Sequence, residues 1–339
     1  MSCRLMSFPV TRSAAIGMLH IPINTILSAP PTWRETLGLP AASTSDWKLF
    51  RRLRNVLNEV SKAKRSERDS KYLDEVRRLS FFSFLEQRMI DEAAIYQEHG
   101  VDSLMIENAA APYFIREQQP SVIYWVMREL AARLRSSHPK TKIGIQVLAF
   151  SDDWAMDIAC RCGLDFIRCE SALFEGVRPE GRTPNAGNLT KLYMTRNMLM
   201  AQLGKDGSGP QIYVDLHKKH TAFMPGLDSL DVWLDNILFQ KLEGVIISGR
   251  ATGCPAEETD LQQARDAIEK FKESSAAAVG AAWAPPLIVG SGVSVENLVM
   301  CKRYADAVIV GSSLKKGGYW ECALDAERVK LFAEAWHDC

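Results

Sequence analysis

Two short loops of small residues near the C-terminal end have the composition of a phosphate-binding site. Gly290-Ser291-Gly292 follows the apolar run 287–289, and Gly311-Ser312-Ser313 follows the apolar run 307–310. Glycine directly after a strand lets the backbone approach a ligand closely, and unpaired N–H groups at that point suit a phosphate. The serine hydroxyls and Lys315 would add further donors. The alternative is that these glycines only permit tight turns. Because two such loops follow consecutive strands, we favour a site for a phosphate or a similar anion.

The segment YVDLHKKH, residues 213–220, holds the densest set of ionisable side chains. If the strand stays extended, Asp215, His217 and Lys219 share one face, because successive side chains of a strand alternate. A carboxylate beside a lysine and an imidazole can transfer protons, and each charge shifts the pKa values of the others. The alternative is a structural ion pair between Asp215 and Lys219, with His217 pointing to water. The spacing leaves both open.

Glu107 and Asn108 form a second candidate pair at the end of an apolar run. They would serve as a base with an orienting amide, or as ligands of a hydrated Mg²⁺. The alternative for Asn108 is a turn conformation, which is common for asparagine. His20, which ends the first apolar run, is either a catalytic residue or a histidine held by hydrogen bonds inside the fold.

Other polar residues end further apolar runs. Arg250 and Thr252 lie in GRATG, residues 249–253, where Arg250 would clamp an anion through two hydrogen bonds. Arg168 and Glu170 follow another run and are expected to pair with each other, and Gln146 ends the run before it.

The elements that must position these residues alternate along the chain. Strands are predicted at 14–19, 101–108, 142–150, 166–171, 211–217, 244–249, 287–289 and 307–310, and helices at 83–100, 117–137, 152–163, 189–203, 227–244, 261–272, from about 295, and 325–336.

This order of strands and helices predicts an α/β fold, a (β/α)₈ (TIM) barrel forming a single domain over residues 1–339. The rival is a doubly wound open sheet, whose glycine-rich phosphate loop normally follows the first strand. Here the first strand is followed by His20-Ile21-Pro22 instead. In a barrel, the carboxyl ends of all strands surround one mouth, and a phosphate site after strands seven and eight is frequent.

Residues 31–80 interrupt the alternation in the first strand-to-helix loop and form a basic, helical insertion. A loop of this length is uncommon inside a barrel. The favoured interpretation is a solvated helical hairpin lying over the barrel mouth. The alternative is a lid or a surface for a protein partner.

Composition excludes several functions. Lys+Arg and Asp+Glu both total 41, which argues against a protein that coats nucleic acid. No stretch approaches ~20 apolar residues, so no membrane span is expected. The scattered cysteines form no C-x-x-C pair, which indicates free thiols, a reducing compartment and no zinc site. Arg4 and Arg12 without acidic neighbours hint at a transit peptide, but the first strand is expected to begin near Ala14 and leaves little to cleave. We therefore expect a cytoplasmic protein, with the mitochondrion as the alternative. A homo-oligomer is left open.

Six motifs, taken in order, resemble the BtpA family. They are Gly17–Pro22, Ile106–Asn108 with Ala111–Tyr113, Asp215 with Lys219 and His220, Ser248–Gly253, Gly290–Asn297 and Val310–Trp320. The resemblance covers about residues 14–336 without the insertion and implies a ribulose-phosphate-binding-type barrel. The family is linked to photosystem I biogenesis in cyanobacteria, and some relatives carry names of isomerases or nucleotide hydrolases. The chain departs from the family pattern after Pro22 and after the fourth strand.

Two hypotheses follow. In the first, the barrel is an enzyme of isomerase or lyase type acting on a small phosphorylated molecule, a sugar or ribosyl phosphate. Asp215 and Lys219 would transfer protons, His220, Glu107 and His20 would assist, and the two glycine-serine loops with Asn108, Arg250 and Thr252 would bind the ligand. In the second, the protein is a non-catalytic assembly or regulatory factor that uses the insertion as its partner surface. A nucleotide hydrolase is a further alternative.

Overall fold

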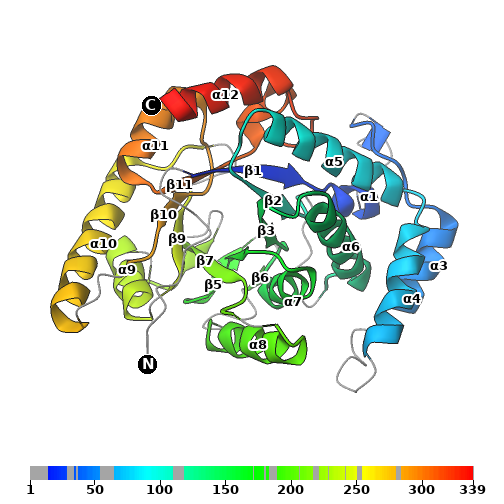
Figure 1. The fold of residues 1–339 in the computed structure, drawn as a ribbon, viewed down its shortest axis with the longest axis horizontal. Coiled ribbons are helices and arrows are strands. Elements are labelled where there is room, and N and C mark those ends of the chain that lie inside the picture. The colour runs from blue at the N-terminus through cyan, green and yellow to red at the C-terminus, as the bar shows by residue number, and fades with distance from the viewer. Residues whose placement is uncertain are drawn as a thin grey trace.

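The strands form a closed parallel barrel, as the sequence predicts (Figure 1). The computed structural model describes residues 14–28, 34–35, 37–53, 65–109, 118–170, 172–178, 181–182, 189–205, 207–216, 221–227, 229–240, 242–249, 254–279 and 284–338. Going round, the barrel strands are β1 (Ala14–His20), β2 (Ser103–Glu107), β3 (Lys142–Gln146), β4 (Phe166–Cys169), β7 (Gln211–Leu216), β9 (Gly244–Ile247), β10 (Leu287–Val289) and β11 (Ala307–Val310), which pairs again with β1.

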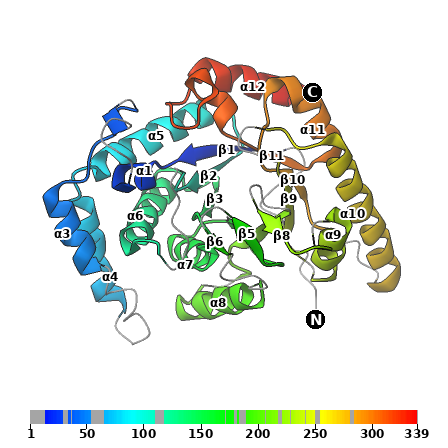
Figure 2. The same cartoon turned by 180° about the vertical axis from the view of Figure 1, so that it is seen from behind.

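Helices between the strands form the outer layer (Figures 1 and 2). They are α5 (Phe82–Glu98), α6 (Ser121–Ser137), α7 (Asp152–Cys162), α8 (Leu189–Gln202), α9 (Leu230–Phe239), α10 (Glu258–Val279), α11 (Leu298–Tyr304) and α12 (Ala326–Asp338). Three 3₁₀ turns, η2 (Val295–Asn297), η3 (Ser312–Leu314) and η4 (Lys316–Gly318), lie near the last two strands. None of the described helices combines the length and apolar character needed to cross a bilayer.

The barrel interior is packed with side chains rather than hollow. Alternate strand residues form one buried apolar cluster, made of Ala14, Ile16, Met18, Met105, Phe166, Tyr213, Ile246, Ile288, Ala307 and Ile309. The rings of Phe166 and Tyr213 stack with centroids 5.1 Å apart. Glycines make room for them, since a Cβ on Gly144 would lie 2.0 Å from the Phe166 ring and one on Gly244 would lie 2.2 Å from the Tyr213 ring. Polar chemistry is therefore confined to the barrel ends.

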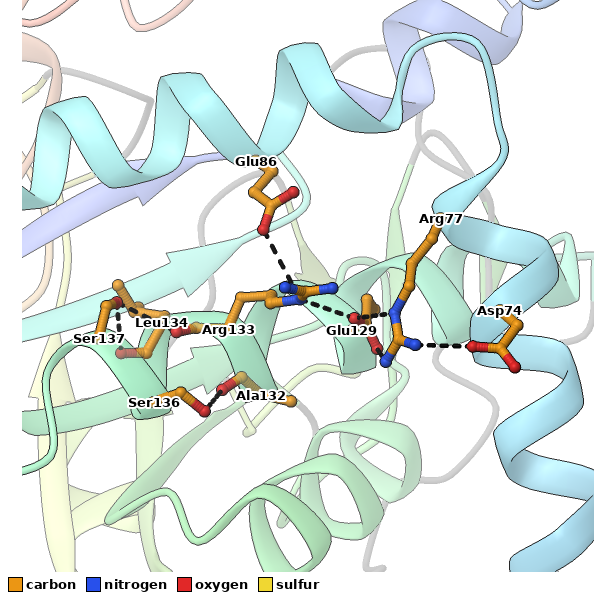
Figure 3. A network of polar contacts seen from close by, with 9 residues as sticks. All are labelled: Asp74, Arg77, Glu86, Glu129, Ala132, Arg133, Leu134, Ser136 and Ser137. Atoms are coloured by element: carbon orange, nitrogen blue, oxygen red, sulfur yellow. Dashed lines mark hydrogen bonds and ion pairs between the residues drawn. The ribbon is translucent and has the colours of Figure 1, made fainter.

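The insertion lies on the flank of the barrel, and its described helices do not cover the mouth. After α1 (Ile23–Ser28) the chain forms α3 (Thr44–Leu53) and α4 (Arg65–Arg77), which run along the outer side of α6 (Figures 1 and 2). Figure 3 shows the ionic part of this contact: Arg77 donates from Nε to Glu129 of α6 at 2.6 Å. The interpretation of a hairpin over the mouth is corrected, because α4 uses its apolar and basic residues to pack against α6.

A small second sheet was not expected from the sequence. It contains β5 (Gly176–Arg178), β6 (Gly181–Arg182) and β8 (Ala222–Phe223) in the antiparallel order β6-β5-β8. These strands belong to the connections that follow β4 and β7, so the sheet lies at the carboxyl end of the barrel (Figure 2). Strands of two or three residues carry too little alternation to be recognised in a sequence.

Candidate functional site

One polar layer lies above the apolar interior at the carboxyl ends of the strands. Side chains of a strand alternate, so the residue two positions after each interior residue also points inward. These positions hold His20, Glu107, Gln146, Arg168, Asp215, Ser248, Gly290 and Gly311, one from each barrel strand. The layer includes several of the strand-end residues that the sequence singles out, and it fixes their neighbours around the ring.

A buried ion pair joins two members of this layer. Arg168 donates from Nε to Asp215 Oδ2 at 3.0 Å and from Nη2 to Asp215 Oδ1 at 2.8 Å. Arg168 is 3% exposed and Asp215 has no exposed surface. Burial alone would lower the pKa of the Arg168 guanidinium, but Asp215, helped by the carboxylates of Glu107 and Glu170, outweighs it and raises this pKa. The pair is therefore ionised and rigid.

The same arginine links Asp215 to the first glycine-serine loop. Arg168 donates from Nη1 to the Gly290 carbonyl oxygen at 3.2 Å and from Nη2 to Ser248 Oγ at 3.1 Å. A Cβ on Gly290 would lie 3.1 Å from Arg168 Nη2 and 2.7 Å from Ser248 Oγ. Glycine at position 290 is thus what allows the guanidinium to approach, and Asp215 and this loop belong to one cluster.

Both glycine-serine loops present backbone donors at the mouth. In the part of the chain that the structure describes, the N–H groups of Ser291, Gly292, Ser312 and Ser313 donate to no protein acceptor. Gly292 has φ +68°, the left-handed region that favours glycine. The hydroxyl of Ser291 accepts a hydrogen bond from the Gly249 N–H at 3.1 Å. The loops combine a fixed shape with unused donors, as an anion site requires.

His20 and Glu107 lie together on the other side of the layer. They are register partners on β1 and β2, and Glu107 is also the register partner of Gln146 on β3. His20 is 9% exposed and its ring is near Trp320, with centroids 6.1 Å apart. A Cβ on Gly311 would be 2.8 Å from His20 Cε1, so this imidazole borders the second loop. Glu107 is only partly buried.

The structure gives Asn108 and Glu170 partners that differ from the expected ones. The Asn108 amide donates to the Leu148 carbonyl oxygen at 2.7 Å and accepts from the Leu148 N–H at 2.6 Å. It holds the β3–α7 loop, a role that neither of the two interpretations of Asn108 predicted. Glu170 accepts from Arg178 Nη1 at 3.1 Å and from the Phe150 N–H at 2.7 Å, so its expected pairing with Arg168 is wrong. Arg178 comes from β5, in the small sheet that the sequence did not predict.

Lys315 is not a phosphate donor in this structure. Its Nζ lies 2.5 Å from Glu92 Oε2 on α5, and the side chain has no exposed surface. Burial lowers the pKa of Lys315 from 10.5 to about 8, although Glu92 acts in the opposite direction. The lysine therefore joins the β11–α12 connection to α5 instead of reaching the mouth.

The Lys315 environment predicts a pH dependence of stability. Below about pH 8 this lysine is protonated in both the folded and the unfolded protein, whereas from about 8 to 10.5 only the unfolded protein keeps the proton. The free energy of unfolding contributed by Lys315 should therefore rise across that interval, by about 3 kcal/mol. Urea unfolding of the native protein and of Lys315→Met at several pH values measures the rise as a difference. Lys316→Met, at an exposed neighbour, is the control, and equal slopes in all three proteins would contradict the expectation.

Several predicted site residues fall outside the described part of the chain, namely His217, Lys219, His220, Arg250 and Thr252. Their roles stay predictions. Among the residues that are described, no group of three or more His, Cys, Asp or Glu side chains is arranged to hold a metal ion. The Mg²⁺ role considered for Asn108 is not supported, since both ends of its amide are bonded to Leu148.

Comparison with known proteins identifies the family. A sequence model of the BtpA family matches residues 80–338. An uncharacterized mitochondrial protein of Caenorhabditis elegans is 30% identical over 247 residues, covering 71% of this chain and 80% of that protein. The photosystem I biogenesis protein BtpA of Synechocystis sp. is 28% identical over 249 residues, covering 74% and 78%. A solved chain of the tryptophan synthase α2β2 complex of Pyrococcus furiosus aligns over 97% of this chain and 100% of its own length, at 12% identity and a TM-score of 0.49. Because the family match covers well over half of its length, this chain belongs to the BtpA family.

Proposed function

We propose that the barrel mouth binds a small phosphorylated molecule, a sugar or ribosyl phosphate, with its phosphate on the two glycine-serine loops. One observation carries the proposal. Adjacent strands β10 and β11 each end in a loop whose N–H groups, at Ser291 and Gly292 and at Ser312 and Ser313, donate to no acceptor within the described residues. Four backbone donors on the loops of two adjacent strands suit the several oxygens of a phosphate better than a single carboxylate.

The charges of the described mouth favour this mode of binding. Arg168 is neutralised by Asp215, and Arg178 by Glu170, so neither arginine is a spare cation for the ligand. Backbone N–H groups then provide the attraction for the phosphate, and the proposed side chains of Lys219 and Arg250 would add to it. Backbone donors keep their direction when a substrate enters, which is the property that electrostatic stabilisation in an active site needs.

Proton transfer of isomerase or lyase type is the chemistry we propose for the rest of the mouth. Asp215 is bound in two places by Arg168 and completely buried, which makes it a better electrostatic support than a proton acceptor. Glu107 points inward, is partly exposed and stands beside His20. Glu107 is therefore the proposed base, with Lys219, His220 and His20 as its partners. Glu107→Gln should lower turnover strongly and leave phosphate binding intact.

Ser312→Asp is expected to abolish phosphate binding without unfolding the protein. Its side chain makes no hydrogen bond within the described residues, so the added carboxylate would repel the anion while leaving the contacts of the loop unchanged. Thermal shift with inorganic phosphate, sugar phosphates and nucleotides measures the effect. We expect at least a tenfold weaker affinity, about 1.4 kcal/mol or more.

The matched control is Ser136→Asp. Ser136 is exposed on the last turn of α6, which leads into the amino end of β3, so the same charge is added at the other end of the barrel (Figure 3). It should bind phosphate like the native protein. Equal affinity of both variants and the native protein would contradict the phosphate assignment to the second loop. Failure of every phosphorylated probe to bind would contradict the proposed function itself.

A second candidate is an assembly or regulatory factor, favoured by one comparison: a relative 28% identical to this chain is named a photosystem I biogenesis protein. The insertion would be its partner surface, where Lys71 on α4 and Arg78 directly after it are exposed. Deleting the insertion would expose the face of α6 that Arg77 and Tyr72 cover. Lys71→Glu with Arg78→Glu is therefore the cleaner test. The second candidate is favoured if this double variant no longer binds a partner protein that both the native protein and Glu107→Gln bind.

We propose a cytoplasmic location, with the mitochondrion as the alternative. The alternative is supported by the C. elegans relative, which is named a mitochondrial protein, and by Arg4 and Arg12 in a segment without acidic residues. Fractionation of cells that express the full chain distinguishes the two compartments.

A further inference from the structure

Gln146 is a fully buried carboxamide without a hydrogen-bond partner. It has no exposed surface, and neither its Oε1 nor its Nε2 has a partner in the described part of the chain. Leaving such a group unsatisfied costs the free energy of removing it from water, so folded proteins rarely keep one without a reason. A methionine of similar shape would fill the same position without that cost.

The side chain belongs to the polar layer of the mouth. Gly144, two residues earlier on β3, faces the Phe166 ring of the barrel interior, so Gln146 also points inward. Its register partner on β2 is Glu107, which is partly exposed. The continuation of the β3–β4 register places Arg168 next to it on the other side. A ligand that enters over Glu107 therefore reaches the level of the Gln146 amide.

Other amides of the barrel show that partners are normally supplied. Asn108 is bonded at both ends by Leu148, and Gln211, at the amino end of the interior, accepts from the Tyr213 hydroxyl at 2.9 Å. Gln146 differs from them, because both polar atoms of its side chain lack a partner among the described residues. Both ends of the Asn24 amide on α1 are also without a partner there, but Asn24 is not on a barrel strand.

We propose that Gln146 and Glu107 form a subsite for a pair of neighbouring hydroxyl groups, the vicinal diol of a sugar. The subsite rests on the proposed function, because it receives the sugar part of the ligand whose phosphate lies on the glycine-serine loops. The carboxamide offers two donors and one acceptor, whereas the carboxylate only accepts. One hydroxyl donates to Glu107 and accepts from Gln146 Nε2, and its neighbour donates to Gln146 Oε1. A ligand with carbonyl groups alone would leave Oε1 unsatisfied.

The first test compares probes on the native protein by isothermal titration calorimetry. The probes are ribose 5-phosphate, 2-deoxyribose 5-phosphate, ribose and inorganic phosphate. A site built to bind a hydroxyl discriminates strongly against the analogue that lacks it. Ribose 5-phosphate should therefore bind at least about tenfold more tightly than its 2-deoxy analogue. Equal binding of the two sugar phosphates would overturn the subsite, and this comparison needs no variant.

The second test is Gln146→Met, which should change stability and binding in opposite directions. Removing an unsatisfied buried amide should raise the Tm of the ligand-free protein by about 2–4 °C. The preference for ribose 5-phosphate over the deoxy analogue should disappear, while inorganic phosphate binds as before. A purely structural role predicts the reverse, namely a lower Tm with the preference retained, and that result would overturn the proposal.

Gln211→Met is the matched control, since it removes a buried, inward-pointing glutamine of the same barrel that has a partner. Its Tm should fall and its preference for the ribose probe should persist. The probes also separate the two proposals. Binding of inorganic phosphate without discrimination between the sugars means that only the diol subsite is wrong. If ribose binds as tightly as ribose 5-phosphate, only the phosphate site is wrong.

Discussion

Arg168→Met should destabilise the protein by about 3–5 kcal/mol, because it removes the guanidinium that pairs with the buried Asp215 carboxylate. Asp215 has no exposed surface, and Arg168 donates one hydrogen bond to each of its oxygens, at 3.0 and 2.8 Å, while Ser248 Oγ donates to Oδ1 at 3.4 Å. The variant also frees the Gly290 carbonyl oxygen, which Arg168 binds at 3.2 Å. Urea unfolding followed by circular dichroism measures the loss, and calorimetry should show that ligand binding is lost with it.

Two further variants separate this effect from a general loss of charge. Arg303→Met breaks an ion pair with Glu258 whose side chains are 62% and 53% exposed, and should leave stability almost unchanged. The double variant Arg168→Met with Asp215→Leu should recover much of the lost stability, because it removes the buried carboxylate together with its arginine. If Arg168→Met were as mild as Arg303→Met, the buried pair would not be the electrostatic centre of the mouth.

The barrel could be predicted from the sequence because its strands are buried on both faces. Such strands appear as short, uniformly apolar runs, as at 287–289 and 307–310, and the structure places β10 and β11 at those residues. Boundaries were less predictable: β3 ends at Gln146, whereas the apolar pattern continues to residue 150. There the chain turns outward, held by the Asn108 amide on Leu148, a contact between residues 40 positions apart.

The partners of the site residues could not be read from spacing along the chain. The sequence suggests Lys219 or His217 for Asp215 because they are near it on the same strand. Lys219 and His217 lie outside the described residues, and the structure shows a further partner, Arg168, on the neighbouring strand β4 and 47 residues away. Strand register decides such pairs, and register emerges only when the barrel closes. Lys315 shows the same limit, since its partner Glu92 is 223 residues distant.

The alternation of side chains along each strand nevertheless indicates which polar residues share the inner layer. Counting two residues onward from the apolar interior positions identifies Arg168 and Asp215 as neighbours on one inner layer, together with Gln146 and Ser248. The insertion had no such internal signal. Its helix α4 is mostly polar, and contacts with α6 such as Arg77–Glu129, Asp69–Arg128 and Tyr72–Trp125 show which side is covered.

Gly292→Ala should destabilise the protein by about 2–5 kcal/mol, the sum of a strained backbone and an overlap with fixed atoms. Gly292 has φ +68°, where an alanine costs roughly 1–2 kcal/mol. Its Cβ would also lie 2.1 Å from the Cys254 carbonyl oxygen, a backbone atom that cannot move aside like the end of a side chain. Overpacking of this kind adds about 1–3 kcal/mol or more. Urea unfolding gives the total.

Gly204→Ala isolates the overlap from the strain. Gly204 has a similar φ of +61°, but nothing lies within 4 Å of the Cβ that would be added. This control should lose only about 1–2 kcal/mol, and the difference between the two variants measures the contact with Cys254. Equal losses of stability would mean that the 290–292 loop can shift away from Cys254 at little cost. A loop that yields could not hold its N–H groups in the fixed array that phosphate binding requires, so the result bears on function as well as on stability.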